Sequence, residues 1–476
     1  MTILLLILFD NKIVIIHFEN MKSQRTQINC SKLKSAPRFY RQWMLAGNPS
    51  NFIDRLIADF GDFVRYRGLL DFYLINDPEL VGIVLKETHK SFDKNTVIYN
   101  RFRNALGNSL VNAEGAHWRR QRKLIQPSFN PASIKSFFAN MVDSSNELAA
   151  KWDRYAVSND SFNLSEDMNV LTLEIAGKSL FSDSFESAAA SIRKWTQVIN
   201  RYSGFPPIPL LTNPRFPTPL NLKLKRTLKE YGSFIQKMLQ ERLEDLGKED
   251  LLSAFLSIRD EETDESMNDT EIAEEVLGMI IGGHETSSTA LTWIFYELNK
   301  HPGIEDKIVK EIHDVIGNRQ MEFGNIQEMK YTKAVIQETL RLHPPLWFEN
   351  RNAMKDVDLG ESKIPKGSMI ILSRYALHRN PRVWEAADEF DPDRFYPEVP
   401  KTINGFKISG AYIPFSSGPR VCIGRHFAIM EIIVVLCTLL QKFRVQVSPR
   451  NQHSVATKLT MEPRNGLLVN VKKRLD

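Results

Sequence analysis

Phe415–Gly424 has the sequence FSSGPRVCIG and lies directly before an apolar stretch with helical periodicity, His426–Phe443. A cysteine thiolate is a strong electron donor, but the thiol has a pKa of about 8.5 in water. The glycines on both sides of Cys422 let backbone N–H groups turn toward the sulfur, and Arg420 and the following helix N-terminus add positive charge. The loop therefore predicts that Cys422 is a thiolate ligand, tuned as sulfur ligands of iron are tuned.

The other two cysteines, Cys30 and Cys437, lack such surroundings, and we expect neither to be the ligand. A buried structural cysteine at a helix start is the alternative interpretation of Cys422, but packing does not require the flanking glycines and arginines. Three cysteines are too few for a disulfide framework and fit a reducing cytoplasm. No cysteine or histidine set has the spacing of zinc ligands.

The loop resembles the FxxGxRxCxG haem-binding motif of the cytochrome P-450 family at every motif position. The resemblance implies that Cys422 is the axial ligand of a haem b iron and that Phe415 and Gly424 belong to the haem-binding loop. It covers the chain from about Phe63 to the C-terminus, and its separated motifs occur in the family's order and spacing.

The resemblance also implies a mainly α fold, with one triangular helical domain and a small β-rich region. We expect residues 26–476 to form this haem domain and residues 1–25 to lie outside it. Phe63–Leu74 and Ile364–Ile371 are expected to contribute strands, the second with a turn at Pro365–Gly367. Proline at position 78 suits the first turn of a helix after Asp77.

Glu338-Thr-Leu-Arg341 resembles the family's ExxR helix motif, and Pro392–Phe395, which contains Arg394, its later PERF-like segment. Residues three apart share a helix face, so Glu338 and Arg341 can pair. A surface pair of this kind contributes under about 1 kcal/mol. The resemblance implies instead that Glu338, Arg341 and Arg394 form a buried triad with a structural role.

Four side chains are expected to hold the haem propionates. Trp118 and Arg122 resemble the family's WxxxR helix, and both can donate hydrogen bonds. Arg420 is a second cation, and Arg351 stands where many family members place a third, although a solvated arginine also fits that position. Carboxylates inside a protein require such partners because an unpaired buried charge is very costly.

Residues Asn268–His301 are predicted to form one long helix, with a capping box of Asn268 and Glu271 at its start. Each glycine inside a helix costs about 0.5–1 kcal/mol relative to alanine, so this helix needs something close against its backbone. Three glycines lie in its middle: Gly278, Gly282 and Gly283.

Residues Gly282–Ser287 resemble the family's [AG]Gx[DE]T[TS] oxygen-binding segment. The resemblance implies that the glycines leave space for O2 over the iron and that the catalytic pair Glu285–Thr286 delivers protons to oxygen. A helix-interior threonine bonded back to a carbonyl is the alternative for Thr286. We interpret His284 as structural and not as a metal ligand.

The motifs together predict a haem-thiolate monooxygenase that inserts one atom of O2 into an apolar organic substrate. Two alternatives use the same fold: isomerisation, dehydration or peroxide-driven oxidation, and a non-catalytic haem sensor or carrier. Family members of the first kind often alter the acid–alcohol pair or the cysteine loop, and a sensor needs neither Glu285 nor Thr286. The His-Glu-Thr variant and the His117–Arg120 pattern resemble those of fatty-acid and other lipid hydroxylases of the family, and this resemblance favours a lipid or fatty-acid-like substrate.

Electrons are expected from a separate protein, because no glycine-rich nucleotide motif or iron–sulfur cysteine set follows the haem loop. A ferredoxin, a flavodoxin-like protein or a reductase fits this role, with NAD(P)H as the ultimate source. The predicted docking surface is a basic patch of Arg119, Arg120, Lys123 and Arg425, for which a solvated helix face is the alternative.

The 476 residues are 42% hydrophobic and 25% charged, which is ordinary for a globular protein. The net charge of +5 is small and basic residues alternate with acidic ones, so nucleic acid is not an expected partner. We expect a cytoplasmic monomer.

The N-terminal apolar runs, Ile3–Phe9 and Ile13–Ile16, are separated by Asp10 and Lys12. A spanning helix needs about 20 mostly apolar residues, so no span is predicted here. Peripheral membrane association through this segment is the alternative localisation, and Met21 is an alternative start of the chain.

Six prolines between Phe205 and Pro219 indicate either a connector or a mobile lid, followed by a long surface helix, Leu220–Leu246. The substrate pocket is expected to lie within Phe92–Ala113 and this proline-rich segment.

Overall fold

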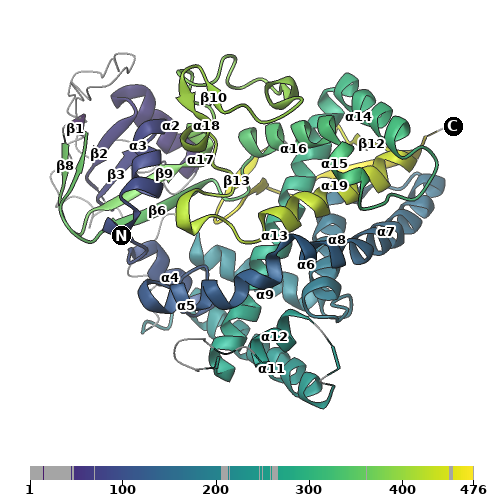
Figure 1. Cartoon of the computed structure of the whole chain (residues 1–476), viewed down its shortest axis with the longest axis horizontal. Coiled ribbons are helices and arrows are strands. Elements are labelled where there is room, and N and C mark those ends of the chain that lie inside the picture. Colours follow the sequence, from purple (N-terminus) through teal and green to yellow (C-terminus); the bar gives the residue numbers. More distant parts are fainter. Residues whose placement is uncertain are drawn as a thin grey trace.

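A computed structural model describes residues 48–474 except 69, 205–212, 214, 246, 249, 258, 260–265, 361 and 450–453, together with Val14–Ile15 and Met44. The described part of the chain is mainly helical and has a roughly triangular outline, with a β-rich region at one corner (Figure 1). The predicted fold class is therefore confirmed. Most of the proline-rich segment and the apolar run Ile3–Phe9 lie outside the described residues.

The largest sheet has the strand order β1-β2-β3-β9-β6-β4, in which only β3 and β9 pair in parallel. Its strands are β1 (Val14–Ile15), β2 (Phe63–Tyr66), β3 (Phe72–Ile75), β4 (Phe92–Asp93), β6 (Phe348–Ala353) and β9 (Met369–Ser373). The predicted strand region Phe63–Leu74 is thus a hairpin of β2 and β3 with Phe63 opposite Ile75. Strand β1 attaches two residues of the N-terminal segment to β2.

Smaller sheets complete the β-structure. They contain β5 (Phe162–Asn163), β12 (Phe443–Val447) and β15 (Leu468–Lys473); β7 (Val357–Leu359) and β8 (Ser362–Ile364); β10 (Thr402–Ile403) and β11 (Phe406–Lys407); and β13 (Val455–Thr457) and β14 (Met461–Pro463). The expected turn at Pro365–Gly367 separates β8 from β9.

Helices form the rest of the domain (Figure 1). They are α2 (Pro49–Phe60), α3 (Pro78–Gly82), α4 (Val97–Leu106), α5 (Gly115–Ile125), α6 (Pro131–Ser136), α7 (Phe138–Ser158), α8 (Leu164–Leu180), α9 (Ala189–Ser203), α11 (Pro219–Glu244), α12 (Leu251–Ser257), α13 (Asp269–Lys300), α14 (Pro302–Val315), α15 (Asn325–Glu328), α16 (Lys330–Leu342), α17 (Arg374–Leu377), α18 (Ile408–Ala411) and α19 (Arg425–Lys442). No helix among the described residues is long and apolar enough to cross a bilayer.

Helix α13 crosses the middle of the molecule and packs against α8, α16 and α19 (Figure 1). The predicted capping box is present, because the Asn268 side chain accepts from the Glu271 N–H and the Glu271 carboxylate accepts from the Asn268 N–H. Of the three glycines in the middle of α13, Gly278 has the closest neighbour, because a Cβ at this position would lie 2.9 Å from Ser109 Oγ. A Cβ on Gly282 would meet no protein atom within 4 Å, so the helix has open space at this position.

Candidate active site

Cys422 lies in the loop that leads into α19. Its N–H donates to the carbonyl oxygen of Phe415 at 2.9 Å, which closes the loop. Gly418 adopts a φ of 71°, and a Cβ at this position would collide with the carbonyl oxygen of Leu85. Only glycine fits there, so the backbone explains the spacing between Phe415, Gly418 and Cys422.

Protein atoms surround the Cys422 thiol closely enough that burial raises its pKa, although one side of the side chain is exposed. The Gly424 N–H and the guanidinium groups of Arg122, Arg374 and Arg425 lower the thiol pKa. We expected Arg420 to act on the sulfur, but it is not among these groups. The Gly424 N–H and the guanidinium groups therefore favour the thiolate form of Cys422, but burial has the larger effect on its pKa. A bound metal ion would complete the ionisation.

Arg420 belongs to a second environment, beside α5. Its guanidinium carbon lies 3.9 Å from the centre of the Trp118 ring, and its nitrogens contact the Ala113 carbonyl oxygen and the Glu114 carboxylate, both at 2.8 Å. Burial lowers the Arg420 pKa to about 10. Trp118 thus provides the platform on which Arg420 rests.

Arg420 lies at the partly exposed edge of a mostly buried group that we call the cation cluster. Its members are Lys94, Arg351, Arg374 and Arg420, with the carboxylates Glu114 and Glu349. Glu349 lies between two of the arginines, 2.9 Å from Arg351 Nη2 and 3.0 Å from Arg374 Nη2. Cations outnumber carboxylates in this cluster, and no motif had pointed to Lys94, Arg374 or the two glutamates.

Lys94 shows the effect of this imbalance. Its Nζ donates to the Val111 carbonyl oxygen at 2.7 Å, and the side chain is almost completely buried. Burial lowers the Lys94 pKa well below its ordinary value, and the charges of Arg351 and Arg420 lower it further. An anion bound beside these three groups would restore the charged ammonium form.

Arg122 lies against the cysteine loop. Its Nη1 donates to the Val421 carbonyl oxygen at 3.0 Å, and its Nε donates to Gln126 Oε1 at 3.2 Å. These contacts fasten α5 to the residue before Cys422. A contact between Arg122 and a propionate stays a prediction.

The middle of α13 has one open side. Gly282 is exposed and Thr286 half-buried, while the neighbouring Ile280, Ile281 and His284 are buried. Thr286 Oγ1 donates back to the Gly282 carbonyl oxygen at 2.9 Å, as in the alternative that we considered for this residue. This contact orients the hydroxyl along the open side of the helix.

Glu285 lies on a buried side of α13. Its Oε1 accepts hydrogen bonds from Asn200 Nδ2 on α9 and, at 3.1 Å, from Thr460 Oγ1 between β13 and β14. Burial is the largest cause that raises the Glu285 pKa to about 8, and the charge of Glu462 adds to it. The carboxyl group therefore holds a proton at neutral pH and can release it.

His284 is completely buried, and its Nδ1 lies against the Ile280 carbonyl oxygen. Burial lowers its pKa to about 4, so the imidazole is neutral. Among the described residues no group of three histidine, cysteine or acidic side chains could hold a metal ion by itself. These contacts fit the structural interpretation of His284.

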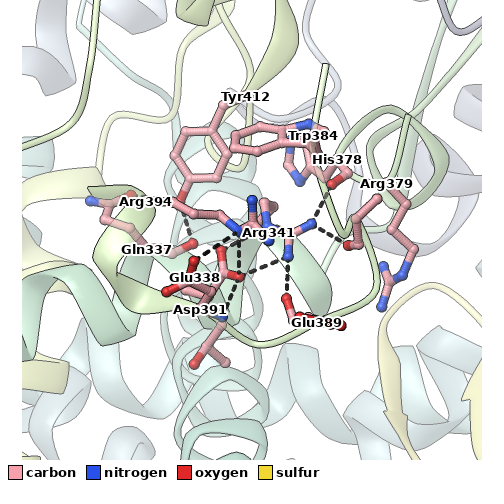
Figure 2. Close-up of polar contacts among 12 residues, drawn as sticks. Gln337, Glu338, Arg341, His378, Arg379, Trp384, Glu389, Asp391, Arg394 and Tyr412 are labelled. Atoms are coloured by element: carbon pink, nitrogen blue, oxygen red, sulfur yellow. Dashed lines mark hydrogen bonds and ion pairs between the residues drawn. The ribbon is translucent and has the colours of Figure 1, made fainter. Parts of the chain in front are cut away.

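The three residues of the predicted triad lie together, and we call them the glutamate–arginine cluster: Glu338, Arg341 and Arg394. Glu338 and Arg341 are fully buried and share two contacts of 2.7 Å, and Arg394 Nε lies 3.4 Å from Glu338 Oε1. Figure 2 shows Arg341 at the centre, close to His378 and Glu389. Arg341 Nη1 donates to the carbonyl oxygens of His378 and Ala387, and Nη2 also donates to the carbonyl oxygen of Glu389. Every charged group of this cluster has a partner within it or on the adjacent backbone.

The exposed side of α5 borders an open cavity of about 580 Å³. Arg119 and Lys123 line it together with Trp118 and Arg122. Arg120 does not belong to this surface: it pairs with Glu271 at 3.1 Å and donates to the Ser266 carbonyl oxygen at 2.7 Å. The predicted basic patch therefore loses Arg120, which ties α5 to the start of α13.

The arrangement fits a haem group. An exposed thiol at the start of α19, an open stretch of α13 at Gly282, and a cation cluster with unmatched positive charge provide what the iron, a ligand of the iron and two propionates require. Cys422 would hold the iron, and Lys94, Arg351 and Arg420 would hold the carboxylates.

Comparison with known proteins agrees with this geometry. A family model described as Cytochrome P450 matches residues 34–471. Pentalenene oxygenase of Streptomyces avermitilis is 32% identical over 431 residues, which cover 90% of this chain and 93% of the relative. Cyclooctatin synthase of Streptomyces melanosporofaciens is 30% identical over 437 residues (88% and 93%), and cyclooctat-9-en-7-ol 5-monooxygenase of the same species is 30% identical over 423 residues (87% and 89%).

Proposed function

This chain belongs to the cytochrome P450 family, and from that premise we propose how its residues carry out the chemistry of a haem-thiolate monooxygenase. The enzyme binds haem and O2 and receives electrons from a redox partner. When bound, the haem supplies the iron at which O2 is activated, so that one oxygen atom enters an apolar substrate and the other leaves as water.

Cys422 would hold the haem iron through its sulfur. The single observation that supports this role most strongly is the environment of its thiol: Cys422 is exposed before α19, yet its sulfur receives the Gly424 N–H and the fields of Arg122, Arg374 and Arg425. Cys437, in contrast, is buried in α19, and burial raises its thiol pKa above the ordinary range.

The test is the absorption spectrum of the reduced protein with carbon monoxide. We expect the long-wavelength Soret band of thiolate-ligated haem in the unchanged protein and its loss in Cys422→Ser. Cys437→Ser is the matched control and should keep the band. Loss of the band in Cys437→Ser alone would overturn the assignment.

Proton delivery is the task of the catalytic pair Glu285 and Thr286. Thr286 presents its hydroxyl on the open side of α13, where oxygen would bind, and Glu285 stores a proton one residue away. Help of this kind is typically worth about 10²–10⁴-fold in rate. Trp118, Arg122, Arg351 and Arg420 serve the propionate side, and Phe415 and Gly424 shape the loop around the ligand.

The substrate is an apolar organic molecule, and a lipid or fatty-acid-like compound is our proposal. The names of the relatives add pentalenene and cyclooctat-9-en-7-ol as first compounds to test. Each candidate can be added to the purified protein while the haem spectrum is followed. A substrate-induced change in the iron spin state identifies a compound that binds at the iron.

A separate ferredoxin, flavodoxin-like protein or reductase supplies the electrons, ultimately from NAD(P)H. It docks beside Arg119, Lys123 and Arg425, close to the cysteine loop. Arg119 and Arg425 are exposed, and the charge of Arg425 reaches the Cys422 sulfur. We propose a cytoplasmic monomer with no nucleic-acid partner.

A further inference from the structure

The hairpin of β13 and β14 reaches from the surface to the middle of α13. Trp293 Nε1 on α13 donates to the Met461 carbonyl oxygen at 2.8 Å, and Trp347 Nε1 donates to the Lys458 carbonyl oxygen at 3.0 Å. The Met461 N–H donates to the Pro345 carbonyl oxygen at 2.9 Å. The backbone of this hairpin is therefore held by contacts that do not involve the Thr460 side chain.

Thr460 and Asn200 meet at the Glu285 carboxyl group. The Thr460 hydroxyl donates to Glu285 Oε1 at 3.1 Å, and the Asn200 amide contacts the same oxygen from α9. Asn200 Oδ1 is buried and has no hydrogen-bond partner among the residues that the structure describes, so it offers an acceptor for the O–H of protonated Glu285 after a half-turn of the amide. Thr460 and Asn200 can therefore hydrogen-bond with the Glu285 carboxyl group whether it is ionised or protonated.

Two charged side chains flank Thr460 at the surface. Lys458 Nζ and Glu462 Oε1 form an exposed pair at 3.1 Å. Among the charged groups that face Glu285, Glu462 raises its pKa and Lys458 lowers it, and Asn200 on α9 is uncharged. The hairpin thus brings both signs of surface charge within electrostatic reach of a buried acid.

We propose that the β13–β14 hairpin positions the proton-delivering acid: the Thr460 hydroxyl fixes the Glu285 carboxyl group, and the Lys458–Glu462 pair tunes it from the surface. This inference rests on the proposed role of Glu285 in the monooxygenase. Thr460 is a positioning residue, because it acts through Glu285 and not on the substrate.

Infrared difference spectroscopy of the haem-loaded protein tests the inference without substrate or reductase. The carbonyl band of protonated Glu285 is identified by its absence in Glu285→Gln, and its pH midpoint is expected near 8. Thr460→Val removes a hydrogen bond that favours the ionised form, so the midpoint should rise by roughly one unit. Thr460→Ser should leave it near the original value.

Thr457→Val is the matched control, because the Thr457 hydroxyl on the same hairpin donates to Asn48 Oδ1 at 3.1 Å and not to Glu285. It should not move the midpoint. At the surface, Glu462→Gln should lower the midpoint and Lys458→Gln should raise it, each by a few tenths of a unit. These two variants carry no risk to the core.

Equal midpoints in Thr460→Val and Thr457→Val would overturn the inference, as would shifts of the same sign in Glu462→Gln and Lys458→Gln. The pH profile of electron coupling to product should move with the infrared midpoint. If the midpoint moves and the coupling profile does not, the hairpin has no part in proton delivery, and the inference fails while the monooxygenase function stands. Absence of the thiolate-type carbon monoxide band in the unchanged protein would instead overturn the proposed function.

Discussion

The glutamate–arginine cluster and the cation cluster are both buried, but their charges are matched differently. Glu338 shares two short contacts with Arg341 and a third with Arg394, and backbone carbonyl oxygens take the remaining Arg341 donors. In the cation cluster, Lys94 donates to the Val111 carbonyl oxygen, and burial together with the guanidinium groups of Arg351 and Arg420 lowers its pKa.

The difference indicates what each cluster does. A buried ion pair whose charges are matched stabilises one arrangement of the chain and leaves no charge for a ligand. A buried cluster with excess positive charge is costly until an anion enters it, so its natural state includes a ligand. We therefore expect the first cluster to be structural, and we propose the second as the site that binds the haem carboxylates.

The largest effect is expected when one member of the glutamate–arginine cluster is removed. Glu338→Ala leaves Arg341 buried without its carboxylate, which costs on the order of 3–5 kcal/mol. Little haem-loaded protein should therefore be recovered, as measured by the ratio of haem absorbance to protein. Glu241→Ala breaks an exposed pair with Lys237 on α11 and is the control that should change nothing. A stable, haem-replete but inactive Glu338→Ala enzyme would contradict the structural role.

Removal of one charge from the cation cluster should leave folding intact but weaken haem binding. Arg351→Gln leaves Glu349 paired with Arg374, so the protein should fold, but it removes a charge-assisted contact to a propionate. Such contacts are worth about 1.5–3 kcal/mol, which corresponds to roughly 10–100-fold weaker haem binding. The rate of haem transfer to an acceptor globin measures this. An unchanged transfer rate would show that Arg351 does not contact the haem.

Glu431 on α19 is a buried carboxyl group that lies in neither cluster. Burial raises its pKa to about 8, against a weak opposing contact with Ser287. Between pH about 4.5 and 8 the folded state holds a proton that the unfolded state has lost, so the free energy of unfolding falls as pH rises through this range. Glu431→Gln should therefore raise the melting temperature at pH 8 and leave it nearly unchanged at pH 5. An equal change at both pH values would mean that Glu431 is not protonated in the folded protein.

Exposed charges should show the smallest effect on the protein itself. Arg119→Glu combined with Lys123→Glu reverses the charge on the side of α5 that lines the open cavity. Reduction by an acidic redox partner should slow by about tenfold at low salt and less at high salt, while haem binding stays constant. Arg201→Glu, on α9, is a control for net charge. Reduction that stays fast and independent of salt would exclude this surface as the docking site.

Local spacing made several features predictable. Residues three apart lie on the same face of a helix, so the pairing of Glu338 with Arg341 could be predicted from the sequence. The capping box of Asn268 and Glu271 depends on the same short-range geometry, and the structure contains both contacts. The cysteine loop was recognisable from its motif, and the positive φ of Gly418 gives the physical reason for one of the motif positions.

Contacts between distant segments were not predictable in this way. Arg120 was assigned to the basic patch because its neighbours are basic, yet helix geometry turns it toward Glu271, 151 residues later in the sequence. Glu285 was identified as an acid, but its partners Asn200 and Thr460 are 85 and 175 residues away. Lys94 belongs to no motif and became visible only through its burial beside Arg351 and Arg420.

The sequence by itself thus determined the cap of the central helix and the short-range ion pair, because a few consecutive residues set that geometry, and it predicted Cys422 as the iron ligand through the resemblance of its loop to the family motif. Only the tertiary structure decided which charges are matched, which are left for a ligand, and how strongly Glu285 holds its proton. Those properties depend on burial and on the electric fields of groups from several segments, and the energy of a buried charge changes steeply with what packs against it.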